Sequence, residues 1–97
     1  MQKRTMKPGR PVGATTYEAE PAIAFGKAVR AARVARQISQ EELATRAGIE
    51  RSHMGKIERG QHMPSLALIL RVSIALNDSA ANLMTATESI LYADSEG

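Results

Sequence analysis

The sequence contains no cysteine and no tryptophan, and one phenylalanine and two tyrosines are its only aromatic residues. Without cysteine it can form neither a disulfide nor a thiolate zinc site. So few aromatic side chains disfavour a base-stacking surface of the kind that binds single-stranded nucleic acid. The chain also lacks an apolar run long enough for a signal peptide or a membrane span, so we expect a cytoplasmic protein with no membrane partner.

Patterns that carry enzyme chemistry are equally scarce. The sequence offers no cysteine nucleophile, no phosphate-binding glycine loop and no paired-carboxylate pocket, so we expect neither an enzyme nor a cofactor. His53 and His62 are the only histidines, and their spacing matches no metal-ligand pattern. We therefore expect two hydrogen-bonded or solvent-facing histidines and no metal.

Charge is distributed unevenly along the 97 residues. Residues 1–36 hold eight Lys and Arg against two Glu, a net charge of +6, whereas residues 65–97 carry a net −3. Residues 37–64 hold four charges of each sign. This asymmetry predicts that the N-terminal part binds a polyanion while the C-terminal part is left for another role.

The predicted fold is all-α, because helix-forming residues are common and the alternation typical of strands is missing. Ser39-Gln40-Glu41-Glu42 forms a capping box that starts a helix, Gly48 ends that helix, and Ser65 caps a later one. Five short helices are predicted, over roughly residues 22–36, 40–47, 51–59, 66–76 and 80–92. They make one domain over 21–92, preceded by a flexible basic arm (1–20) and followed by an acidic tail (93–97).

The second and third predicted helices are joined by only Gly48-Ile49-Glu50, so they must turn sharply and pack closely. Ala44 is small enough for that crossing, and Ile49, Met54 and Ile57 point into the angle between the helices. The segment QEELATRAGIERSHMGKIERG, followed by PSL, resembles the helix-turn-helix of the phage-repressor-like (Cro/XRE) family. The resemblance covers about residues 22–76 and implies a compact five-helix bundle of the lambda-repressor-like DNA-binding type.

One face of the third predicted helix is basic and hydrogen-bonding, since its period places Arg51, Ser52, Gly55, Lys56 and Arg59 together. Arginine and lysine on such a face can bond guanine in the major groove. The resemblance implies that Arg51, Ser52 and Lys56 read bases. It places Gln40 where a side chain bonds a phosphate or braces the reading residues, and Arg59 and Gln61 are assigned to phosphates as well. The alternative is an ordinary solvated charged face.

Three residues near this face depart from the simplest pattern. Glu50 precedes the third helix and either complements the helix dipole, which we favour, or accepts from cytosine N4. Gly55 weakens a helix interior by about 1 kcal/mol, which suggests a close approach to the sugar-phosphate chain. Glu58 falls on the buried side. The resemblance implies that it pairs with Arg33 in the first helix, and the alternative is a surface pair of little energetic value.

The fourth and fifth predicted helices offer more apolar surface than one small core readily uses. Such excess favours a symmetric dimer over a larger intramolecular core. The residues assigned to the dimer interface are Leu68, Val72, Leu83, Ile90 and Leu91.

The stretch KPGRPVG, residues 7–13, has two prolines, two glycines and no apolar period, and is a poor start for a folded domain. Its Gly-Arg-Pro core resembles the AT-hook, which sets an arginine in a narrow A·T minor groove; Pro8 replaces the second basic residue of the fuller pattern. We therefore assign Arg10 and Lys7 to the minor groove. A charged linker is the alternative.

These features together predict a sequence-specific transcription regulator, a repressor or autoregulator, that binds double-stranded DNA. We expect a homodimer on an inverted-repeat operator. The alternative from a different class is an antitoxin-type module that binds a protein partner and also binds DNA, for which the acidic segment after Tyr92 is the candidate protein-binding region.

Overall fold

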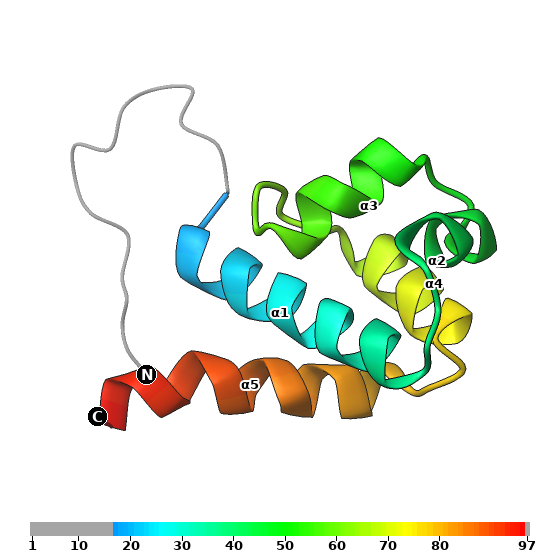
Figure 1. Ribbon diagram of the computed structural model, residues 1–97. Helices are drawn as coiled ribbons and strands as arrows, with labels where there is room; N and C mark the ends of the chain where they lie inside the picture. Colours follow the sequence, from blue (N-terminus) through cyan, green and yellow to red (C-terminus); the bar gives the residue numbers. More distant parts are fainter. Residues whose placement is uncertain (1–16, 97) are drawn as a thin grey trace.

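The computed structural model describes residues 17–96, which form five α-helices and no strand. They are α1 (Ala19–Ala35), α2 (Gln40–Ala47), α3 (Arg51–Glu58), α4 (Leu66–Ala75) and α5 (Ala80–Glu96). In Figure 1, α5 runs antiparallel to α1 along one side of the molecule, and the other three helices lie on the opposite side of α1. The predicted all-α, five-helix fold is confirmed.

Serine side chains start three of the helices. The hydroxyls of Ser39, Ser65 and Ser79 each accept from the backbone N–H three residues later, at 3.0, 3.1 and 3.0 Å. Each such bond satisfies one of the N–H groups left open at a helix start and contributes about 1 kcal/mol. The predicted caps at Ser39 and Ser65 are therefore confirmed. The other half of the capping box is replaced, because the Glu42 carboxylate accepts from Arg46 Nη2 at 2.6 Å.

Two helix ends differ from the prediction. Helix α1 begins at Ala19 and includes Pro21 in its first turn, where a missing N–H has no helical partner to lose. Helix α1 therefore includes Ala19 and Glu20, which the prediction assigned to the arm. Helix α5 extends to Glu96 instead of fading after Tyr92, because neither glycine nor proline interrupts the chain between Ser79 and Gly97.

The core draws on all five helices. Its fully buried side chains include Val29, Leu43, Met54, Ile57, Val72 and Leu76. The stripe of α5 that contains Leu83 packs towards the rest of this core, with Met84 and Ile90 at its edge.

The dimer interface predicted on α4 and α5 is wrong for Leu68, Val72 and Leu83. These three side chains are 5%, 0% and 3% exposed and belong to the core of a single chain. Apolar residues occupy nearly every position of α4, so tertiary packing decides which of its faces is buried. The face left in solvent carries Leu66, Leu70 and Ile74, which are 73%, 45% and 75% exposed. We call these three residues the α4 stripe.

Between residues 17 and 96, no single helix is long and apolar enough to cross a membrane. Helices α4 and α5 meet the length and composition requirement only as a pair, with a bend of 106° between them.

Candidate nucleic-acid interface

Helices α2 and α3 pack against each other and are joined by a tight turn at Gly48. That residue caps α2 with φ 75° and ψ 31°, the left-handed conformation that glycine adopts without steric penalty. The following N–H, of Ile49, bonds to the Ala44 carbonyl at 3.0 Å and closes the turn. Met54 and Ile57 of α3 are 0% exposed beneath this turn. One side of α3 is therefore fixed in the core, and the opposite side must face solvent.

The outward side of α3 carries the residues predicted to read bases. Arg51, Ser52 and Lys56 are all exposed, and Arg59 and Gln61 are exposed at the end of the helix. The structure thus brings the three predicted base-reading residues onto one face. This face therefore presents two cationic side chains, Arg51 and Lys56, and the hydroxyl of Ser52. All three can donate hydrogen bonds to the acceptor atoms that guanine exposes in the major groove.

A buried ion pair locks α3 against α1. Arg33 donates to both carboxylate oxygens of Glu58, from Nε at 2.7 Å and from Nη2 at 3.0 Å. Its Nη1 also donates to the Ile38 carbonyl at 3.0 Å. The side chains of Arg33 and Glu58 are 13% and 3% exposed, so this pair is not the surface contact that was the alternative. The hydrogen bond to Glu58 raises the pKa of Arg33, while burial opposes that rise.

Gln40 braces the same pair from α2. Its Nε2 donates to Glu58 Oε1 at 3.1 Å, so three helices meet at one carboxylate. Behind this network α1 touches α3 directly, since a Cβ at Gly26 would lie 2.3 Å from the Ile57 carbonyl oxygen. The orientation of α3 against α1 is therefore set by a charged network and by a close backbone contact.

Gly55 is buried, which corrects its assignment to the exposed basic face. A Cβ at this position would lie 3.0 Å from Arg59 Nη1 and 3.5 Å from Gln40 Oε1. Arg59 also donates from Nε to Gln61 Oε1 at 3.1 Å. The guanidinium of Arg59 and the amide of Gln40 thus cover Gly55, because side chains on a helix lean towards its N-terminus.

His53 and His62 pack edge to face, with ring centroids 4.6 Å apart. Loss of solvent lowers the pKa of His53, the neighbouring His62 and Lys56 lower it further, and Glu50 opposes them. His53 Nε2 is buried without a hydrogen-bond partner. This corrects the expectation that both histidines are hydrogen-bonded or solvent-facing. In the described part of the chain, no three His, Asp or Glu side chains are grouped closely enough to hold a metal ion.

The predicted minor-groove residues Lys7 and Arg10 lie outside the described residues. The first described residue, Tyr17, donates its hydroxyl to the Gly60 carbonyl at 2.6 Å. Gly60 directly follows the C-cap of α3. The Tyr17 hydroxyl therefore lies beside the C-terminal end of α3. Sequence reasoning missed this contact, because nothing local links residues 43 positions apart.

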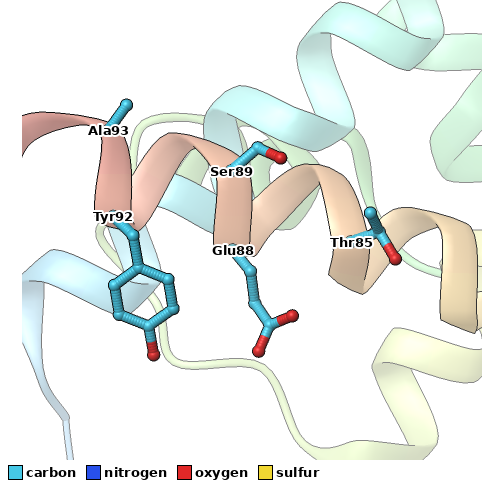
Figure 2. Close-up of a pocket in the computed structure, with 5 residues that line it drawn as sticks. All are labelled: Thr85, Glu88, Ser89, Tyr92 and Ala93. Carbon is cyan, nitrogen blue, oxygen red and sulfur yellow. The ribbon is translucent and has the colours of Figure 1, made fainter.

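The outer surface of α5 has a depression lined by Thr85, Glu88, Ser89, Tyr92 and Ala93. Figure 2 shows that all five come from this one helix, with Glu88 and Tyr92 extending to the same side. A surface made by a single helix does not surround a small molecule, which sites for such ligands usually do. The basic face of α3 remains the strongest candidate site.

Comparison with known proteins places the chain in a family. The HTH_3 helix-turn-helix model matches residues 29–79. The chain is 41% identical over 59 residues to the uncharacterized HTH-type transcriptional regulator YazB of Bacillus subtilis, covering 61% of this chain and 86% of YazB. It is 45% identical over 49 residues to the regulator y4dL of Sinorhizobium fredii, covering 50% of this chain but only 25% of that longer relative.

A solved structure agrees with these relatives. The restriction-modification controller protein C.AhdI of Aeromonas hydrophila is 40% identical and superposes with a TM-score of 0.63, covering 64% of this chain and 94% of C.AhdI. Residues 29–79, which the family model matches, contain the α2–α3 turn and the Arg33–Glu58 pair described above. The chain belongs to the HTH_3 family, the Cro/XRE type of helix-turn-helix transcription regulators.

Proposed function

We propose that this protein binds a specific double-stranded DNA sequence as a homodimer and thereby regulates transcription. The observation that carries the proposal is the basic face of α3, on which Arg51, Ser52 and Lys56 are exposed together while the rest of the helix is fixed in the core. A helix presented in this way fits the major groove of B-DNA. Arg51 stands at its first residue, the end that meets base edges in helix-turn-helix proteins.

Phosphate contacts are assigned to the residues that flank the helix. Arg59 and Gln61 are exposed at its C-terminal end and bonded to each other, so one partly ordered cationic group is available there. Gln40 is half-buried and donates to Glu58. In the free protein it therefore acts as a brace, and the second N–H of its amide nitrogen is left to donate to a phosphate.

A second copy of the chain is the proposed occupant of the α4 stripe. Leu66, Leu70 and Ile74 recur every fourth residue and leave an apolar band in solvent, as association surfaces do. Arg71 is the only charged residue of α4, and its Nη1 lies 3.6 Å from the position of a Cβ on Gly48, away from the stripe. Two stripes can therefore face each other across a twofold axis without repulsion between like charges. Ile90 and Leu91, both half-buried, remain candidates for the edge of this interface.

The basic arm is proposed to contact the adjacent minor groove. The Tyr17–Gly60 bond supports this, because it ties the first described residue to the end of α3 that carries Arg59. Arg10, assisted by Lys7, would then recognise groove width and A·T content instead of single bases.

Selection of bound duplexes from a random DNA pool tests the proposed function. We expect an inverted repeat whose half-site centres are about 34–36 Å apart, one helical turn, or a multiple of that distance. A protein that enriches no sequence would contradict the proposal. Co-purification with a stable protein partner would favour the antitoxin-type alternative.

A further inference from the structure

Among the described glycines that lie inside helices, only Gly55 would place an added Cβ against side chains that can move. A Cβ on Gly26 would meet the backbone of α3 at 2.3 Å, so that glycine is required for folding. At Gly55 the nearest atoms instead belong to the ends of long side chains, Arg59 at 3.0 Å and Gln40 at 3.5 Å. Glycine weakens a helix relative to alanine, and no backbone contact at Gly55 offsets this loss. A different reason for glycine is needed here.

The geometry points to Gly55 as a positioning residue for Arg59. Without a side chain at residue 55, the Arg59 guanidinium lies along the flank of α3, and its Nε–H bonds to Gln61 Oε1 at 3.1 Å. The guanidinium is thus held at the rim of the basic face before DNA arrives. A cation restrained in this way loses less conformational freedom when it binds a phosphate.

This inference rests on the proposed DNA binding, but the arrangement it describes exists in the free protein. An alanine at residue 55 requires Arg59 to move by a few tenths of an ångström. A leucine would occupy the space that the guanidinium fills and turn Arg59 away from the helix. The core side chains of Met54 and Ile57 are not among the atoms nearest to a Cβ at residue 55, whereas Gln40 Oε1 is, at 3.5 Å.

A double-mutant cycle on the selected operator tests the inference. We expect Arg59→Ala to lower affinity about tenfold, the loss of one charged phosphate contact, and to reduce the salt slope by about one. Gly55→Leu should produce a similar loss, and combining it with Arg59→Ala should add almost nothing. If Gly55→Leu weakens binding as much in the Arg59→Ala background as in the wild type, residue 55 faces DNA directly and the inference is wrong.

Gly55→Ala provides the decisive variant if the leucine substitution prevents folding. It should raise the melting temperature by about 4 °C through helix propensity while lowering affinity about twofold or threefold, and the loss should vanish in the Arg59→Ala background. A merely structural glycine predicts falling stability instead. Unchanged affinity in Gly55→Ala, with a tenfold loss in Arg59→Ala, would overturn the inference.

The NMR signal of the Arg59 Nε–H reports the same positioning without DNA. In the free wild-type protein this proton should exchange more slowly than the Nε–H of an exposed arginine without a partner, because it is bonded to Gln61. Exchange should become faster in Gly55→Leu and stay unchanged in a control, Thr45→Leu, on the exposed side of α2. Absence of DNA binding by the wild type would refute the proposed function, while this exchange rate would still decide whether Gly55 positions Arg59.

Discussion

Replacing Arg33 with methionine removes the cation that neutralises a buried carboxylate. Glu58, whose side chain is 3% exposed, would keep only the 3.1 Å bond from Gln40, and the Ile38 carbonyl would lose its donor. Removal of one partner from a buried pair typically destabilises a protein by about 3–5 kcal/mol. For a domain of this size such a loss corresponds to a fall in melting temperature of about 12 °C or more. We expect the variant to be close to unfolded, since small domains have only about 5–15 kcal/mol of stability.

Urea denaturation followed by far-UV circular dichroism measures this effect. The matched control is Glu42→Gln, which breaks the exposed pair with Arg46 (52% and 44% exposed) and should alter the free energy of unfolding by only about 0.5 kcal/mol. The double variant Arg33→Met/Glu58→Leu should be more stable than Arg33→Met alone, because no buried charge is then left without a partner. A loss below about 1 kcal/mol for Arg33→Met, or a double variant less stable than the single, would refute the reasoning.

Three further predictions concern pH, assembly and the arm. Burial lowers the pKa of His53, so as the pH falls the histidine is protonated in the unfolded chain before it is protonated in the folded protein. The free energy of unfolding should therefore fall as the pH drops below about 6.5, until the folded pKa is passed. Urea unfolding at pH 7.5 and 5 should show a smaller fall in His53→Asn than in the wild type. An equal fall in both proteins would contradict this. Ile74→Glu should give folded monomers by sedimentation at micromolar concentration, whereas Thr85→Glu should not; a monomeric wild type would exclude the proposed stripe contact. Deletion of residues 1–13 should lower the salt slope of DNA binding, and Arg10→Ala, unlike Arg4→Ala, should abolish a preference for A·T-rich flanks; equal, flank-independent losses would indicate a charged tether.

Features encoded by neighbouring residues were predicted from the sequence. The caps at Ser39 and Ser65 and the left-handed turn at Gly48 each depend on a few adjacent positions, and the structure contains all three. The sharp turn between α2 and α3 was predicted from their three-residue connection, and the family resemblance supported it. Arg33 and Glu58 are 25 positions apart, and only the family resemblance connected them before the structure placed them together.

The errors arose where several helices decide the outcome. Helix α4 is apolar on nearly every side, so its sequence alone could not show that Val72 is buried and Ile74 exposed. Gly55 follows the period of the exposed face, yet long side chains from α2 and from the end of α3 cover it. Hydrophobic periodicity identifies one face of a helix but does not reveal which neighbours reach across it.

The central claim is that the exposed face of α3 reads bases, and the most direct measurement is an affinity scan of the selected operator with every single base-pair change. Wild type should lose about 1–3 kcal/mol at each contacted pair. Arg51→Ala should lose discrimination at one base pair in each half-site, placed symmetrically, while preferences elsewhere and binding to random DNA stay nearly unchanged. An Arg51→Ala profile with full wild-type discrimination at every position would contradict the account.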